Sequence, residues 1–478
     1  MKHILALGAV LALSACDAVG PNFMRPQAPL ADRFAFAHAP ELLDVAQEQW
    51  WTHLGDPLLN QFMAEGLSSN LSLKVARARI AESEALLRAE GVSSQISGDL
   101  TGRGTGVLRS DGSTNSSSSA TLTGRYVFDL FGGVTRSRER ALANLNASIF
   151  DTAQTRLAYQ ADLAGAMIQA RFFQDATRIT EQTIQSRRRI LGLTSEMRAL
   201  GQATRNDQVR ARAELAQAQA DLPGLRNGVR SNAIRVAVLL DQPVAHVLAR
   251  ISGASHQLRP TVHFGAGVPA NLVRNRPDIL AAEQRLAGAY ANLGVAEADL
   301  YPSLTLDGTL NAATEGTFTI GPILSVPVLS RGRLVPLRDA ARTRVDQAEL
   351  TWRNTVRQAV GDVEGALVEI DTARQEIDAL GVALGNFRTL ATLSRETFQI
   401  GSTTLLALLD TDEDVRRIEL QRAGAWRDLA QGLARLAVAT GRGHAVELDP
   451  APPSIITLRP KPTSRDLSDD TLILGATY

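Results

Sequence analysis

Four carboxylates stand close together in the second half of the chain, at Asp410, Asp412, Glu413 and Asp414. On a helix, Asp410 and Asp414 share a face while Asp412 points elsewhere. If Asp410 were repeated by symmetry around a pore, it would form an acidic constriction that holds cations and repels anions. The alternative is a solvated acidic helix start, which the helix dipole favours just after the turn at Gly401. Both interpretations stay open, because the sequence does not show the symmetry of an oligomer.

No other set of residues points to catalysis or to a cofactor. The seven histidines are scattered, and none has a second histidine three or four residues away, so no zinc or copper site is expected. No phosphate-binding P-loop, nucleophile elbow or Rossmann glycine cluster occurs in context. Lys and Arg number 50, and so do Asp and Glu, so net charge does not favour nucleic acid. We therefore expect no enzyme activity, no cofactor and no nucleic-acid partner.

The single cysteine, Cys16, ends a segment that starts with the basic Lys2 and continues as an apolar run from Ile4 to Leu13. About ten apolar residues are too few to span a bilayer but suit a secretory signal. The sequence Leu13-Ser14-Ala15-Cys16 resembles the bacterial lipobox, in which the signal is cut before the cysteine and the new terminus is acylated. We predict a signal peptide over 1–15 and a covalent lipid such as palmitate on Cys16. The alternative is a plain secretory signal with an incidental free thiol.

The elements that must position these residues occur twice along the chain. Arg79-Ile80-Ala81 aligns with Arg285-Leu286-Ala287 about 206 residues later. Gly201 and Thr204 align with Gly401 and Thr404 about 200 residues later. The pattern indicates two copies of one unit, each with a helix, a β segment and a long helical hairpin.

The β segment of each copy is marked by a hydrophobic period of two. Strands are predicted at about 96–108 and 119–128 in the first copy, joined by a loop of Ser and Gly from 110 to 119, and at about 303–311 and 317–326 in the second. Their length and alternation suit transmembrane strands, although a half-buried sheet in a soluble domain also alternates. No further apolar run is long enough for a transmembrane helix, so any crossing is expected to use strands. Four strands cannot close a barrel, so closure would need several chains.

Helical periodicity precedes and follows each β segment. A first amphipathic helix is predicted from Leu58 to about Gln95. Residues 134–200 and 337–400 contain no proline, and about 65 residues form roughly 100 Å of helix. Each long helix ends at a glycine and then resumes, so helical hairpins are predicted over 134–240 and 336–438. The two turns read Gly201-Gln202-Ala203-Thr204 and Gly401-Ser402-Thr403-Thr404.

These elements predict a mainly α-helical chain with a transmembrane β part and two tandem repeats, at 49–240 and 271–440. Residues 16–48 are rich in Pro and Ala and are predicted to form an extended tether. The linker over 241–270 contains Pro243, Pro260 and Pro269. The C-terminal tail over 441–478 is predicted to be laid on the surface or disordered.

Three segments carry a resemblance to a known family. They are Val19-Gly20-Pro21-Asn22-Phe23-Met24-Arg25-Pro26, the stretch from Gln49 to Phe62 with its Trp-Trp and Asp-Pro-x-Leu elements, and the stretch from Arg276 to Gly308. The chain resembles the TolC-like outer membrane factors, the outer membrane efflux conduits of Gram-negative bacteria. It is most similar to their lipoprotein, NodT-like branch, and the resemblance covers nearly the whole chain.

This resemblance implies a homotrimer in which three chains give a twelve-stranded outer membrane β-barrel and a periplasmic α-barrel. Members of the family are passive ducts for drugs and other solutes. They dock with a periplasmic membrane-fusion adaptor and an inner membrane proton-driven pump of the RND type. The implied location is the cell outer membrane, with a lipid anchor and an extension into the periplasm.

Carried over by position, the resemblance assigns roles to single residues. The two hairpin turns, Gly201 to Thr204 and Gly401 to Thr404, match the periplasmic tips that meet the adaptor, and Asp410 matches an aspartate of the closed gate. Two departures stand out. Ala407 occupies a position where some relatives have a second gate aspartate, so the acidic ring would be single. Asp17 follows the lipidated cysteine, a residue that retains lipoproteins in the inner membrane of some enteric bacteria; the predicted barrel argues against this rule here.

The leading hypothesis is therefore a passive duct for small toxic solutes in a tripartite efflux system. A duct for type I protein secretion is an alternative that the pore residues do not exclude. A lipid-anchored periplasmic coiled-coil scaffold without a pore would explain the helices but leaves the four alternating strands unexplained.

Overall fold

The computed structural model describes residues 18–27, 30–37, 49–92, 95–253, 258–261, 269–312 and 316–444. All of them belong to one unit, Met1–Ala445. The predictions for the signal peptide, for Cys16 and for the tail beyond residue 444 fall outside the described residues.

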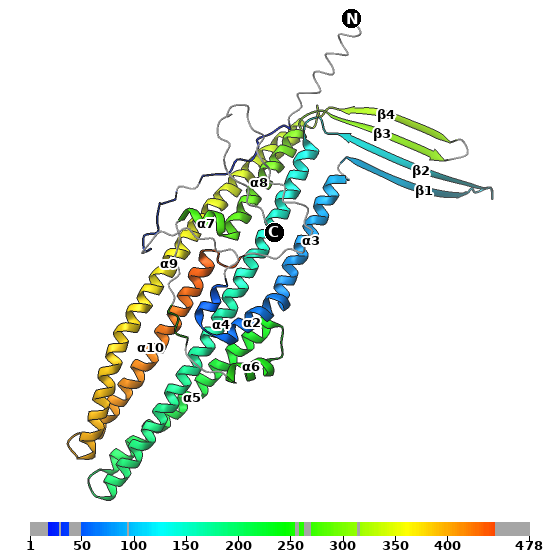
Figure 1. The fold of residues 1–478 in the computed structure, drawn as a ribbon. Coiled ribbons are helices and arrows are strands. Elements are labelled where there is room, and N and C mark those ends of the chain that lie inside the picture. The colour runs from blue at the N-terminus through cyan, green and yellow to red at the C-terminus, as the bar shows by residue number, and fades with distance from the viewer. Residues whose placement is uncertain are drawn as a thin grey trace. The chain divides into compact units, whose positions relative to one another are not determined.

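The order of helices and strands repeats within the chain (Figure 1). The first repeat contains the 3₁₀ helix η1 (Trp50–Leu54), α2 (Pro57–Ser69), α3 (Leu71–Val92), β1 (Ile96–Leu108), β2 (Thr114–Phe128), α4 (Gly133–Ala199) and α5 (Arg205–Leu240). The helix α6 (Val244–Gly253) follows it. The second repeat contains α7 (Pro269–Asn275), α8 (Pro277–Ala298), β3 (Ser303–Ala312), β4 (Thr317–Ser325), α9 (Arg331–Gln399) and α10 (Leu405–Ala439).

The two repeats pack against each other through α4. Within the repeats, α3 lies along α4 and α8 lies along α9; between them, α4 also contacts α8 and α10. In the first hairpin α4 packs on α5, and in the second α9 packs on α10. None of the helices in the described residues combines the length and the hydropathy that crossing a membrane requires.

The prediction of one helix from Leu58 to about Gln95 was wrong, because Asn70 interrupts it. The ψ angle of Asn70 is 128°, outside the helical range. Its side-chain oxygen accepts a hydrogen bond from the Leu73 amide at 3.1 Å, which starts the next helix. Its side-chain nitrogen donates to the Leu239 carbonyl at 2.9 Å. The break therefore fastens α2 and α3 to the end of α5.

Two further boundaries differ from their predictions. Strand β2 begins at Thr114, so the predicted Ser and Gly loop shrinks to a turn in which the Arg109 amide donates to the Ser113 carbonyl at 2.9 Å. The serines that follow pair with β1, since a β ladder needs backbone groups and not apolar side chains. Helix α9 begins at Arg331, ahead of Pro336, so this proline lies in the second turn of the helix, where it removes one backbone hydrogen bond.

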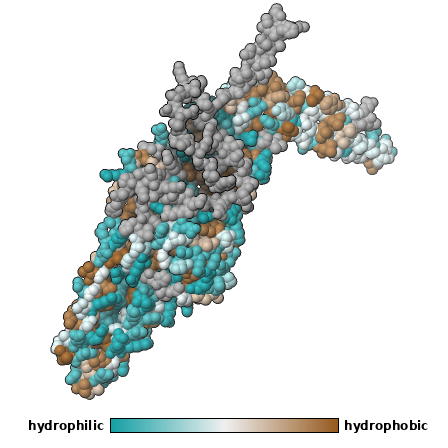
Figure 2. Space-filling model, in the orientation of Figure 1, coloured by the Kyte–Doolittle hydropathy of each residue, from teal (hydrophilic) through white to brown (hydrophobic). Residues whose placement is uncertain are grey.

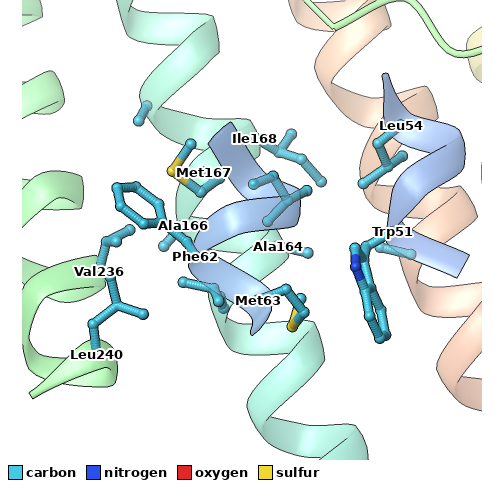
Figure 3. Close-up of a cluster of buried hydrophobic side chains, with 14 of the residues drawn as sticks. Trp51, Leu54, Phe62, Met63, Ala164, Ala166, Met167, Ile168, Val236 and Leu240 are labelled. Atoms are coloured by element: carbon cyan, nitrogen blue, oxygen red, sulfur yellow. The ribbon is translucent and has the colours of Figure 1, made fainter. Parts of the chain in front are cut away.

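A buried cluster ties the first hairpin to the shorter helices (Figure 3). It includes the labelled Trp51, Leu54, Phe62, Met63, Ala164, Ala166, Met167, Ile168, Val236 and Leu240. Helix α6, in the predicted linker, joins this cluster through Val247 and Ile251. The indole of Trp50 donates to the side chain of Gln160 at 3.1 Å, so its polar group is satisfied inside the core.

Candidate functional site

The four strands form one antiparallel sheet in the order β1-β2-β3-β4. Among the described residues, β1 pairs only with β2 and β4 only with β3, so the sheet has two open edges. The register joins the two repeats directly, because β2 of the first pairs with β3 of the second.

The register places apolar side chains opposite one another across all four strands. Leu100 pairs with Leu122, Leu122 with Leu310, and Leu310 with Phe318. In the single chain this face is open to solvent, with Leu100 75% exposed and Phe318 66% exposed. The space-filling view shows hydrophobic patches over the strands (Figure 2). An apolar face that nothing covers is typical of strands that face lipid or a partner.

The opposite face of the sheet is polar. Arg125 on β2 forms two hydrogen bonds with Asp307 on β3, at 3.0 and 2.8 Å. The side chains of Thr105 and Ser117 lie 2.7 Å apart, also on this face. The alternation predicted from the sequence is confirmed, and it gives the sheet one apolar side and one polar side.

The two hairpin turns have the same local structure. Gly201 and Gly401 adopt φ angles of 74° and 76°, which favour glycine, and each closes the end of a long helix. Thr204 and Thr404 then cap α5 and α10 by accepting hydrogen bonds from the amides of Asp207 and Ala407. The pKa of Asp207 is lowered by hydrogen bonds from the Thr204 hydroxyl and backbone amide.

A buried apolar cluster holds the two turns side by side. It contains Ile190, Met197, Ala211, Phe398, Leu405, Leu408 and Leu409, from all four helices of the hairpins. The residues of the turns themselves are exposed or half-buried. The structure therefore brings both predicted docking turns to one end of the helical region.

The acidic cluster divides between two faces of α10, as the helical spacing predicts. Asp410 is exposed. Asp414 forms an ion pair with Arg417 at 2.7 Å. Asp412 instead accepts a hydrogen bond from the Ser186 hydroxyl of α4 at 2.7 Å. Only Asp410 is left as an exposed carboxylate of this cluster with no described ion pair.

An ionic cluster that the sequence did not reveal joins the two hairpins beside Asp412. Arg187 on α4 is nearly buried and contacts Glu413 on α10 at 2.5 Å and Glu214 on α5. Its Nε lies 3.8 Å from Asp412. Arg187 stands in a run of three arginines, Arg187-Arg188-Arg189, and nothing in that run marks which side chain turns inward.

Burial raises the pKa of Asp412, and the hydrogen bond from Ser186 and the charge of Arg187 offset only part of this effect. The native state then binds the proton more tightly than the unfolded chain does. Stability therefore falls as pH rises from the unfolded-chain pKa through the native one. We expect the stability of the Asp412→Asn variant to depend less on pH over this range. We also expect its thermal unfolding temperature at pH 7 to be higher than that of the unchanged protein.

Circular dichroism of the detergent-solubilised protein between pH 4 and 7 checks this expectation. Asp414→Asn is the matched control, because it removes a carboxylate from an exposed ion pair and is expected to change stability by less than about 0.5 kcal/mol. A lower unfolding temperature for Asp412→Asn at pH 7 would contradict the effect of burial.

The family model for the outer membrane efflux protein matches residues 63–241 and 268–442. Nodulation protein T of Rhizobium leguminosarum bv. trifolii is 31% identical over 449 residues, which cover 91% of this chain and 96% of that protein. The pyoverdine export outer membrane protein OpmQ of Pseudomonas aeruginosa is 27% identical over 474 residues, which cover 91% of this chain and 99% of that protein.

Among solved structures, the outer-membrane channel OprN superposes with a TM-score of 0.81 at 25% identity, and the match covers 89% of this chain and 99% of that one. The predicted TolC-like fold class is confirmed by this likeness. The family model covers both tandem repeats, with their strands and hairpins. The chain therefore belongs to the outer membrane efflux protein family.

Proposed function

We propose that three copies of this chain assemble into the outer membrane duct of a tripartite efflux system. The observation that carries the proposal is the sheet, which has one apolar face, one polar face and two open edges in a chain of the outer membrane efflux protein family. Open edges are not tolerated in lipid, so β1 of one copy must pair with β4 of the next. Three copies give twelve strands, with the apolar face toward lipid.

The internal repeat supports the same assembly in the helices. Among the described residues of one chain, α4 packs against both α3 and α8, whereas α9 packs against only α8 of these two helices. In the second repeat α8 and α9 correspond to α3 and α4 of the first. Because α4 has α8 beside it, we expect α9 to have an equivalent neighbour, and α3 of the adjacent copy would fill that place. Exposed apolar side chains stand on both of these helices, with Leu86 on α3 59% exposed and Leu350 on α9 65% exposed.

Electron microscopy of the detergent-extracted protein tests the duct. We expect a hollow particle with threefold symmetry, well over roughly 100 Å long because its hairpin helices are of that length. Monomers or solid rods would contradict the proposal and would favour the scaffold without a pore.

The cargo that we propose is a small solute. OpmQ is named for the export of pyoverdine, which supports solute export over protein secretion. Deleting the gene is expected to increase sensitivity to toxic compounds and to leave the secreted proteins unchanged. Loss of a secreted protein with unchanged sensitivity would favour the secretion alternative.

The two hairpin turns would be the docking site for a periplasmic adaptor, which in turn would connect to a proton-driven inner membrane pump. The two turns are adjacent, and each presents an exposed polar side chain, Gln202 in the first and Ser402 in the second, while Ala203 packs against the buried cluster. A photocrosslinker at position 402 is expected to capture the adaptor in cells, and a crosslinker at the exposed Ala64 on α2 is the control. Equal capture at both positions would contradict docking at the turns.

Asp410 would be the acidic ring of the closed gate. It is exposed on α10 close to the Gly401 turn, where three copies would bring three carboxylates together. Like charges that converge repel one another unless they are protonated or bind a cation. Asp410→Ala is expected to raise single-channel conductance or antibiotic leakage several-fold, measured in planar bilayers and in cells.

Asp414→Ala is the matched control for Asp410→Ala, because Asp414 lies one turn further on the same helix and is paired with Arg417. It is expected to leave conductance unchanged. If Asp410→Ala behaves like Asp414→Ala, then Asp410 is part of a solvated helix start and not of a gate.

The membrane anchor that we propose is a lipid on Cys16. The described residues that follow this cysteine, from Ala18 onward, contact α4 through Asn22 and α8 through Arg25. Incorporation of labelled palmitate that Cys16→Ala abolishes would support the anchor, and incorporation that persists would contradict it.

A further inference from the structure

The first described residues of the chain enter a built site where β2 gives way to α4. The Val19 amide donates to the Phe131 carbonyl at 3.1 Å, which continues the backbone pairing past the end of β2. The Arg136 guanidinium, in the first turn of α4, donates to the carbonyls of Val19 at 3.3 Å and Gly20 at 3.2 Å. It also donates to the side chain of Asn22 at 2.8 Å and, more weakly, to the Ala18 carbonyl at 3.5 Å.

The Arg136 side chain is buried against this peptide and is not a solvated surface residue. Its side chain is 5% exposed, and its only ion pair among the described residues is with Glu139 at 2.9 Å. A guanidinium presents several donors in a fixed fork, so one side chain can satisfy successive carbonyls and an amide oxygen.

The walls of the site are shaped for close approach. A Cβ on Gly132 would lie 2.3 Å from the Ala18 Cβ, and a Cβ on Gly294 would lie 2.8 Å from the Arg136 side chain. Any larger residue at either position would push the peptide or the guanidinium out of place. Gly132 precedes α4 and Gly294 lies in α8, so both repeats contribute to the site.

The segment continues along α8 in the antiparallel direction. After Gly294, the Phe23 ring meets Tyr290 edge-on at 5.9 Å, and Arg25 pairs with Glu283 at 2.7 Å. Further on, Phe34 is buried and the Ala35 amide donates to Glu364 of α9 at 2.7 Å. The order of contacts places Ala18 at the end of α8 from which β3 continues, beside the sheet.

We propose that Gly132, Arg136 and Gly294 form a docking site for the chain's own Ala18–Asn22 peptide, which holds the acylated cysteine at the boundary between sheet and helices. This inference rests on the proposed lipidation of Cys16. Two residues span at most about 7 Å, so the lipid must start within that distance of Ala18. The lipid and the strands would then both enter the membrane at the boundary between the sheet and the helices. Arg136 is a positioning residue that acts through the peptide.

Hydrogen exchange followed by mass spectrometry on the purified, acylated full chain tests the docking. Arg136→Gln is expected to speed exchange of the amides between Val19 and Phe23 at least tenfold. Arg136→Lys keeps the charge but offers no fork, so an intermediate rate is expected. Arg138→Gln is the matched control, because Arg138 is exposed two residues away, and it is expected to leave the rate unchanged.

Asn22→Ala is the second variant, since it removes the 2.8 Å acceptor without a change in α4. A smaller increase in exchange, confined to the same peptide, is expected. Unchanged exchange in both Arg136→Gln and Asn22→Ala would overturn the proposal. So would equal loss of protection throughout α4 and α8, which would make Arg136 a residue of the helical core.

Palmitate labelling of the same samples separates this inference from the lipid anchor on which it rests. Labelled Cys16 with unchanged exchange in Arg136→Gln overturns the docking site alone. Fast exchange in Arg136→Gln together with an absence of label on Cys16 overturns the lipid anchor. The docking of the Ala18–Asn22 peptide would then stand without a lipid to position.

Discussion

Ile320→Arg is expected to abolish insertion of the proposed trimer into the outer membrane. Ile320 lies on the edge strand β4, where it pairs with Gly308 on the apolar face of the sheet and is 61% exposed. An arginine facing lipid costs about 2–4 kcal/mol near the bilayer midplane, and a trimer would bear this cost three times. The heat-modifiable trimer band from outer membranes, followed by urea extraction, measures the effect. We expect most of the variant to be extractable by urea and monomeric.

Thr319→Arg is the matched control, because Thr319 is the adjacent residue on the same strand and pairs with Thr309 on the polar face. An arginine there would face the aqueous interior of the proposed barrel, beside the side of the sheet that already carries Arg125 and Asp307. Trimers and membrane insertion are expected to persist. If both variants inserted equally well, the apolar face would not be the lipid face.

The sheet could be predicted from the sequence because a strand repeats every two residues, so alternation alone assigns each side chain to a face. The helix break at Asn70 and the start of β2 at Thr114 were not predicted, because no period in the side-chain hydropathy marks either of them. Asn70 breaks a helix by contacts to Leu73 and to Leu239, and the second lies far away in the chain. The serines after Thr114 join the sheet through backbone pairing, which carries no signal in side-chain hydropathy.

In the candidate site, too, some features could be predicted from the sequence and others could not. Both hairpin turns could be predicted, since a glycine at the end of a helix followed by a capping threonine is a local signal. The helical spacing also separated Asp410 from Asp412. The partners of Asp412 could not be predicted, because Ser186 and Arg187 approach it from a helix more than 200 residues earlier. Local patterns give the elements, and the packing between the repeats decides which charges they bury.

Arg171→Met is expected to destabilise the folded chain by about 3–5 kcal/mol, the cost of leaving one member of a buried ion pair alone. Arg171 and Asp56 have side chains that are 0% and 1% exposed, and two hydrogen bonds of 2.8 and 3.2 Å join them. Arg171 also donates to the Ile251 carbonyl, so it links α4 to α6. Asp56 is at the same time the N-cap of α2, where it accepts from the Leu58 amide at 2.9 Å. The Asp-Pro element of the sequence thus has a partner deep in the first hairpin.

Urea denaturation followed by pulse proteolysis measures the loss, and two further variants identify its cause. Arg353→Met removes an exposed ion pair with Glu349, four residues away on one helix, and is expected to cost no more than about 0.5 kcal/mol. Asp56→Ser combined with Arg171→Met keeps a capping oxygen for α2 and removes both charges. The double variant is expected to be more stable than Arg171→Met alone, because no buried carboxylate is left without its cation. If the double variant were less stable instead, the loss would come from the packing of the arginine stem, and the ion pair would not be what fastens α2 to α4.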